Sequence, residues 1–268
     1  MTNRIDKTFE ALREKREGAL VTFITAGDPQ SIPTETLIAV LAKAGADIVE
    51  VGIPYSDPLA DGPSIQNAGQ RALDSGTTPK TVLESIKASR AFTDVPIVMM
   101  TSYNLVLCYG VERFADAAAE AGADGAILTD LPPEEATRWK LAADSRGIAT
   151  IFLVAPTSTK ERIKIITEAT TGFVYCVSRT GVTGAQLELP ADLKQLLSDT
   201  RSATDKPLCV GFGVSSPEHV RQVVETADGA VIGSALVNFL HSHAQDANVI
   251  DLVTEQVANW KQGTRTSL

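Results

Sequence analysis

Eight short apolar runs, rich in β-branched residues, recur along the 268-residue chain, with helical stretches between them. Their average spacing, 268 residues over eight runs or about 33 residues, is close to the length of one βαβ unit. Most runs are apolar throughout instead of alternating with polar residues, which is typical of parallel strands covered on both faces. The expected strands are Ala19–Thr25, Ile48–Gly52, Pro96–Thr101, Gly125–Thr129, Ala149–Val154, Phe173–Ser178, Leu208–Gly211 and Ala230–Ile232.

Eight such units predict an α/β fold, a closed (β/α)8 barrel that spans residues 1–268 as one domain, because open doubly wound sheets commonly use about five or six strands. The motif Ala-Gly-Ala-Asp ends a helix before a strand at both Ala44–Asp47 and Ala121–Asp124, which supports one repeated building block. Additional helices are expected at Lys7–Arg16, at Ile65–Ser75 after the second strand, and at Val249–Thr264 at the C-terminus.

Composition excludes several classes of partner. With 24 Lys and Arg against 33 Asp and Glu, the net charge is −9, which argues against a nucleic-acid-binding protein. No apolar run approaches the roughly 18 residues that span a bilayer, and the N-terminus lacks the apolar core of a signal peptide. We therefore expect a soluble cytoplasmic protein that binds neither nucleic acid nor membrane.

Metal and nucleotide signatures are missing from the sequence. No spacing of His, Cys and carboxylate residues resembles a metal site, so none is expected. The G-x-G-x-x-G fingerprint and the Walker A lysine are also absent. His219, His241 and His243 all fall in the last fifth of the chain, and we expect them to lie away from the functional site.

Barrel enzymes carry their sites at the C-terminal ends of the strands. Glu50 lies near such an end, on the face that would point into the barrel mouth. Burial there would raise the pKa of its carboxyl group into the range useful for proton transfer, unless a neighbouring Arg or Lys neutralises it. The loop that follows carries Asp57 and Asp61; either could oppose Glu50 or form a turn, and the turn role is preferred for Asp57 only.

Glycines mark the ends of three later strands, at 178–184, 211–213 and 232–235. Glycine lets backbone N–H groups approach an anion, and a helix N-terminus adds partial positive charge. Barrels often bind phosphate at the loops after strands seven and eight. A small phosphorylated substrate is therefore predicted, although tight turns also use glycine, and the loop at 178–189 is expected to close over it.

The run from Glu50 to Gln66, EVGIPYSDPLADGPSIQ, resembles the signature of the tryptophan synthase alpha subunit. The segments Ser178–Gly184 and Gly211–Ser215 resemble further motifs of that family in the same order, and the resemblance covers essentially the whole chain. It implies a (β/α)8 lyase of tryptophan biosynthesis that cleaves indole-3-glycerol phosphate into indole and glyceraldehyde 3-phosphate. It also implies an alpha2beta2 heterotetramer with a beta subunit that holds pyridoxal phosphate, and no cofactor in this chain.

The resemblance also assigns roles to individual residues. Glu50 matches the family's acid–base group, and Asp61 matches the carboxylate that holds the indole N–H. Ser102 stands where the family usually has an aromatic residue near the indole. The other implied residues are Gly184, Gly213, Gly233 and Ser234 around the phosphate, Phe23, Tyr175 and Thr183 in the substrate pocket or its closing loop, and Asp57, Asn104, Asp130 and Arg179 in loop closure and partner contact.

Three other functions remain possible at this point. A different phosphosugar barrel, such as an epimerase or isomerase, accounts for the glycine loops but not for the run from Glu50 to Asp61. A catalytically idle subunit could act only by activating a beta partner. A stand-alone indole-releasing lyase would keep the site and have no partner.

Overall fold

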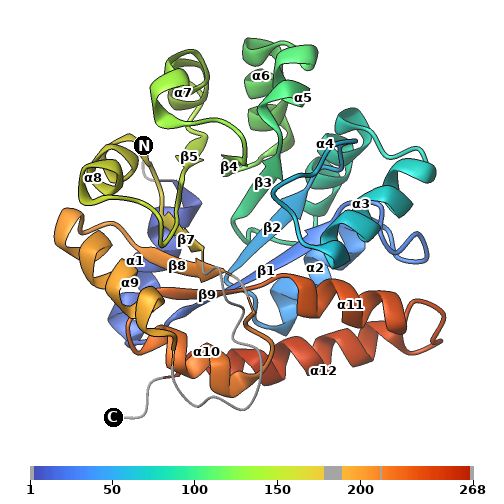
Figure 1. Ribbon diagram of the computed structural model, residues 1–268. Coiled ribbons are helices and arrows are strands. Elements are labelled where there is room, and N and C mark those ends of the chain that lie inside the picture. The colour runs from blue at the N-terminus through green and yellow to red at the C-terminus, as the bar shows by residue number, and fades with distance from the viewer. Residues whose placement is uncertain (1–2, 178–188, 212, 266–268) are drawn as a thin grey trace.

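A computed structural model of the chain describes residues 3–177, 189–211 and 213–265 (Figure 1). The described strands are all parallel, in the order β5-β4-β3-β2-β1-β9-β8-β7-β6. They are β1 (Ala19–Thr25), β2 (Ile48–Gly52), β3 (Ile97–Thr101), β4 (Gly125–Leu128), β5 (Ala149–Ile151), β6 (Leu153–Val154), β7 (Val174–Val177), β8 (Leu208–Gly211) and β9 (Gly229–Ile232).

The sheet closes on itself through the fifth expected strand, which is interrupted at Phe152. Its first piece, β5, pairs with β4, and its second piece, β6, pairs with β7. The predicted (β/α)8 barrel is therefore confirmed, with the expected fifth strand seen as two short ones.

Helices surround the barrel (Figure 1). The three additional helices are confirmed as α1, α3 and α12, and α1 begins earlier than expected because Asn3 caps it in a capping box with Asp6. The helices are α1 (Arg4–Lys15), α2 (Thr34–Ala44), α3 (Pro63–Asp74), α4 (Pro79–Ser89), α5 (Tyr103–Tyr109), α6 (Val111–Ala121), α7 (Thr137–Asp144), α8 (Lys160–Ala169), α9 (Ala191–Ala203), α10 (Pro217–Val224), α11 (Ser234–Ser242), α12 (Val249–Gln262) and the 3-10 helix η1 (Pro133–Glu135).

Two apolar layers hold the fold together. One fills the space between strands and helices, and the other fills the barrel interior with inward-facing side chains such as Val21, Ile127 and Cys209. Helix α1 adds Ile5, Phe9 and Leu12 to the interior layer. This helix therefore closes the N-terminal end of the barrel, and the opposite end is left for a site.

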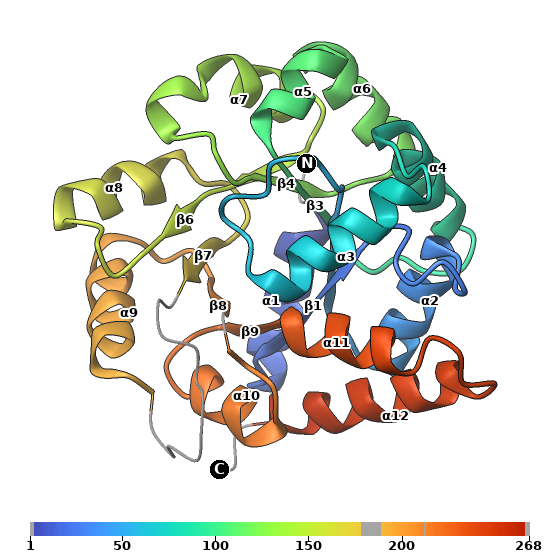
Figure 2. The ribbon, with the colours of Figure 1, turned by 45° about the vertical axis from the view of Figure 1, so that its right-hand side comes forward.

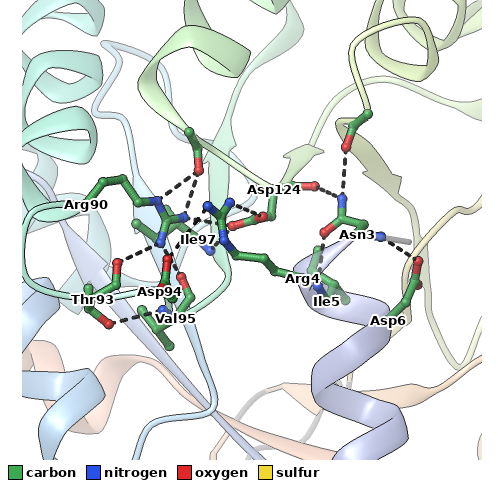
Figure 3. A network of polar contacts seen from close by, with 12 residues as sticks. Asn3, Arg4, Ile5, Asp6, Arg90, Thr93, Asp94, Val95, Ile97 and Asp124 are labelled. Atoms are coloured by element: carbon green, nitrogen blue, oxygen red, sulfur yellow. Dashed lines mark hydrogen bonds and ion pairs between the residues drawn. The ribbon is translucent and has the colours of Figure 1, made fainter. Parts of the chain in front are cut away.

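A polar network centred on the buried Asp124 fastens α1 to that closed end (Figure 3). The Asp124 carboxylate accepts hydrogen bonds from Arg4 (3.0 Å), Arg90 (2.8 Å) and the backbone N–H of Ile97 (2.9 Å). Asn3 donates from Nδ2 to the carbonyl oxygen of Asp124 at 2.6 Å. The network thus joins α1, α4, β3 and the residue that precedes β4.

The repeated Ala-Gly-Ala-Asp motif has a common structural role. Asp47 accepts from the N–H of Leu20 in β1, as Asp124 accepts from Ile97 in β3, so each aspartate binds the strand beside the one it precedes. Asp228 repeats this arrangement with Leu208 of β8, although its local sequence reads Thr-Ala-Asp-Gly. The motif therefore stabilises strand pairing at the closed end.

Among the described residues, no helix combines the length and the apolar character that crossing a bilayer requires.

Candidate active site

A cavity of about 800 Å³ lies at the C-terminal ends of the strands. It receives side chains from β1, β2, β3, β4, β6, β7 and β9, and from helices α3, α10 and α11. Helices α3 and α11 lie side by side next to the barrel mouth (Figure 2). The site predicted from strand ends is therefore enclosed partly by one of the additional helices.

Glu50 faces this cavity from the middle of β2, paired in register with Phe23 of β1 and Val98 of β3. Its side chain is almost completely buried, and neither carboxyl oxygen has a hydrogen-bond partner among the described residues. Burial raises the pKa of Glu50 to about 8, and the negative charge of Asp61 adds to the shift. At neutral pH Glu50 therefore holds a proton that it can donate.

Asp61 lines the same cavity from the loop between β2 and α3. Gln66 of α3 holds this loop by donating from Nε2 to the carbonyl oxygens of Asp61 (2.8 Å) and Pro58 (3.2 Å). Partial burial raises the pKa of Asp61 to about 6. Asp61 is thus mostly ionised at neutral pH while Glu50 is mostly protonated, a division expected of an acid and a charge-stabilising carboxylate.

Two aromatic side chains form the walls next to Glu50. Phe23 lies over Gly52, and a Cβ atom added to Gly52 would stand 2.7 Å from the Phe23 ring. Tyr175 lies over Gly211 in the same way, and a Cβ atom added to Gly211 would stand 2.4 Å from the Tyr175 hydroxyl oxygen. Both glycines therefore make room for an aromatic ring on the neighbouring strand. Together with Ile65, Met100 and Leu153 the two rings give the cavity mostly apolar walls, which suit a flat aromatic group.

Gly213, Gly233 and Ser234 lie together at the ends of β8 and β9 and line the cavity. Gly213 has a φ of 76°, a left-handed conformation that favours glycine. Gly233 stands before α11, which has no capping side chain among the described residues, so the amides of its first turn are available to an anion. These three residues therefore lie together on one side of the cavity, where the sequence predicts a phosphate-binding site.

Three of the four residues expected in loop closure and partner contact do not line the cavity. Asp57, Asn104 and Asp130 are all exposed at the same end of the barrel, and Asp130 accepts a hydrogen bond from the N–H of Tyr103. Ser102 is the N-cap of α5, and its hydroxyl group accepts a hydrogen bond from the N–H of Leu105. It does not line the cavity, where the family's aromatic residue would lie near the indole. Gly184, Thr183 and Arg179 lie outside the described residues, as do residues 178–188 of the loop at 178–189 that is expected to close over the substrate.

Tyr55 connects two loops of the site. Its hydroxyl group lies 3.3 Å from Oγ1 of Thr129, which follows β4 and lines the cavity. The bond joins the loop that carries Asp61 to the end of β4, two strands along the sheet from β2. Sequence reasoning did not assign a role to either residue.

The expectation that all three histidines lie away from the site is wrong for His219. It sits in the first turn of α10 and lines the cavity, while His241 and His243 lie at the far end of α11. The start of a helix at Ser216-Pro217, directly after the seventh expected strand, is the signal that could have placed His219 at the mouth. Among the described residues, no group of three His, Cys, Asp or Glu side chains could hold a metal ion.

Comparisons with known proteins decide the family. The sequence matches the family described as "Tryptophan synthase alpha chain" over residues 9–265. It is 47% identical to the tryptophan synthase alpha chain of Geobacter sp. (strain M21) over 97% of both chains, and 50% identical to that of Geobacter sulfurreducens over 88% of this chain and 89% of the relative. The chain belongs to the tryptophan synthase alpha chain family.

Solved structures agree with this family. Tryptophan synthase subunit alpha from Legionella pneumophila superimposes with a TM-score of 0.90 at 37% identity, covering 98% of this chain and 99% of the other. A chain of Mycobacterium tuberculosis tryptophan synthase gives 0.89 at 34% identity over the whole of both chains. The predicted family, barrel fold and lyase activity on indole-3-glycerol phosphate in tryptophan biosynthesis are thereby confirmed.

Proposed function

We propose that this tryptophan synthase alpha chain cleaves indole-3-glycerol phosphate with Glu50 as the acid–base group and Asp61 as the charge-stabilising carboxylate. The observation that carries the proposal is the buried, unpartnered carboxyl group of Glu50 in a cavity shared with Asp61. Structural carboxylates at such depth are normally paired, so an unpaired one in a cavity points to a reacting group.

The reaction breaks the bond between indole C3 and the glycerol chain, and indole leaves only after C3 is protonated. Glu50, which is protonated at neutral pH, donates that proton. As the carbon–carbon bond breaks, its electron pair returns to the indole ring. The neighbouring glycerol hydroxyl becomes the aldehyde of glyceraldehyde 3-phosphate and returns its proton to Glu50. The carboxyl group therefore ends the cycle in its starting state.

Asp61 acts on the intermediate between these two proton transfers. Protonation at C3 places positive charge on the indole ring and its nitrogen. An ionised carboxylate beside the N–H stabilises that charge in a largely apolar cavity, where electrostatic interactions are stronger than in water. The aromatic walls of Phe23 and Tyr175 hold the ring in place. Gly213, Gly233 and Ser234 bind the phosphate through backbone amides.

An indole-release assay with matched variants tests the assignment of Glu50. The wild-type chain should convert indole-3-glycerol phosphate into equal amounts of indole and glyceraldehyde 3-phosphate. Glu50→Gln should lower kcat by about 10²–10⁴-fold, because the amide cannot transfer the proton. Glu14→Gln removes an exposed carboxyl group of α1 at the closed end and should keep wild-type turnover. A folded Glu50→Gln protein with normal kcat would refute the acid–base role.

The proposal includes a beta partner in an alpha2beta2 heterotetramer, with pyridoxal phosphate held by the beta subunit and no cofactor in this chain. It is supported by the exposed residues beside the mouth, where Asp57, Asn104 and Asp130 accompany Leu59, whose exposed fraction is 94%, and Leu107. Light scattering after mixing with a tryptophan synthase beta subunit tests the stoichiometry, and an unchanged monomer mass would favour the stand-alone lyase. The proposed location is the cytoplasm, which cell fractionation tests.

A further inference from the structure

The backbone amides of the cavity supply less positive charge than a bound phosphate group requires. The described residues that line it include two acids, Glu50 and Asp61, and His219 is the only basic side chain among them. A phosphate monoester carries about −1.5 to −2 charges at neutral pH, whereas one helix N-terminus supplies only about +0.5. The net charge of −9 gives no general attraction for an anion.

His219 is held in a fixed position on the phosphate side of the cavity. Its backbone N–H donates to Oγ of Ser216, and its ring Nδ1 lies 3.3 Å from Oγ of Ser215. Trp260 of α12 fixes the backbone of Ser215 by donating from Nε1 to the Ser215 carbonyl oxygen at 2.9 Å. Among the described residues the ring makes no other hydrogen bond, so Nε2 is the nitrogen left for a ligand.

The same side of the cavity contains the anion-binding backbone. Gly213 lies in the loop that leads from β8 into α10, and Ser234 begins α11 after β9, the neighbouring strand. Ser215 and His219 complete that side as cavity-lining residues. An anion bound at Gly213 and Ser234 would therefore have the His219 ring beside it.

We propose that His219 recognises the phosphate group of the substrate by donating a hydrogen bond from Nε2 to a phosphate oxygen. This inference rests on the proposed function, since it concerns the phosphate end of the same substrate. His219 is then a substrate-binding residue that contacts the phosphate, while Glu50 and Asp61 act on the indole. Its loss should weaken binding of the phosphate ester and leave binding of the indole moiety unchanged.

Binding measured by calorimetry with two separate probes tests this role. Glycerol 3-phosphate reports on the phosphate end, and indole reports on the aromatic end. His219→Ala should raise the Kd of glycerol 3-phosphate about five- to tenfold, the loss expected for one charge-assisted hydrogen bond that is partly open to solvent. The Kd of indole should not change. In turnover, KM for indole-3-glycerol phosphate should rise more than kcat falls.

Two further variants exclude a merely structural effect. His219→Gln keeps a neutral donor and should restore part of the affinity for glycerol 3-phosphate. His241→Ala removes an exposed histidine at the far end of α11 and should change neither Kd. An unchanged Kd for glycerol 3-phosphate in His219→Ala, or an equal weakening of both probes, would overturn the inference and leave the proposed function intact. A wild-type chain that bound neither probe would instead overturn the proposed function, and the inference with it.

Discussion

Two carboxyl groups of one cavity have different protonation states because their surroundings differ. Glu50 lies within β2, where burial removes most water from its carboxyl group and no described residue gives it a hydrogen bond, so its charged form is poorly stabilised. Asp61 lies on a loop at the mouth and is only partly buried. The pKa values of about 8 and about 6 follow from that difference in depth.

The raised pKa of Glu50 predicts a pH dependence of stability. The folded state binds the proton more tightly than the unfolded chain, whose reference pKa is 4.5, so the contribution is complete below that pH and is lost as pH rises through about 8. Relative to wild type, Glu50→Gln should therefore gain about 2–4 kcal/mol of unfolding free energy between pH 5 and pH 9. Urea unfolding across this range measures it. The unfolding free energy of Glu14→Gln should depend on pH as that of wild type does. The same pH dependence in Glu50→Gln and wild type would contradict the titration of a buried Glu50.

The two aspartates of the loop after β2 should behave differently in the isolated chain. Asp61→Asn removes the charge that we propose stabilises the indole nitrogen, and it should lower kcat by about 10²-fold, the scale found for removal of one electrostatic stabiliser. Asp57→Asn is the matched control, because Asp57 is exposed and outside the cavity. Steady-state indole release compares them, and a larger loss for Asp57→Asn would reverse the assignment.

At the scale of elements, catalytic geometry depends on how loops are tied to the ends of strands. The loop after β2 is held to α3 by Gln66, and the contact between Tyr55 and Thr129 holds it to the end of β4. The loop after β8 is held from outside the barrel by Trp260 of α12. Two of the three additional helices, α3 and α12, thus fix loops of the site.

Removing the Tyr55 hydroxyl group tests the contact between Tyr55 and Thr129 with little change in side-chain shape. Tyr55→Phe should lower kcat by about three- to tenfold, because one hydrogen bond is worth about 1 kcal/mol and its loss loosens the loop that carries Asp61. Thr129→Val should have a similar effect, and the double variant should be no worse than either single one. Tyr109→Phe is the control, since the Tyr109 ring packs on Phe114 away from the site. Additive losses in the double variant would show that the two residues act separately.

At the scale of the whole molecule, the closed end of the barrel stabilises the fold, and the open end holds the cavity to which we assign the reaction. Helix α1 closes the bottom through Ile5, Phe9 and Leu12 and through the Asp124 network (Figure 3). Both oxygens of Asp124 are used, and its side chain is almost fully buried. Stability and chemistry are thus carried by different ends of the barrel.

Asp124→Asn should destabilise the protein and leave the chemistry intact. The amide cannot satisfy both Arg4 and Arg90, so we expect a loss of about 2–4 kcal/mol in unfolding free energy. Asp94→Asn removes an exposed partner of Arg4 whose side chain is 95% accessible, and it should cost less than about 0.5 kcal/mol. Denaturant unfolding measures both, with kcat as the second readout. Equal stabilities for the two variants would contradict the importance of the network.

The sequence by itself determined the features that depend on local periodicity. The apolar runs placed the strands, and alternation along β2 placed Glu50 on the inner face. The glycines after the late strands predicted an anion site, and those in the described part of the chain line the cavity. Such patterns predict which way a side chain points, because a strand alternates faces regardless of its neighbours. The run from Glu50 to Gln66 then indicated the family.

Only the tertiary structure decided what surrounds each of those side chains. The pKa of Glu50 depends on the absence of polar partners from other strands among the described residues, and the position of His219 depends on where α10 begins relative to the mouth. Asp228 joined the pattern of Asp47 and Asp124 only through strand pairing. Closure of the barrel brings residues more than 150 positions apart, such as Glu50 and His219, into one cavity. Desolvation and contact depend on that distance in space, which no local pattern of residues encodes.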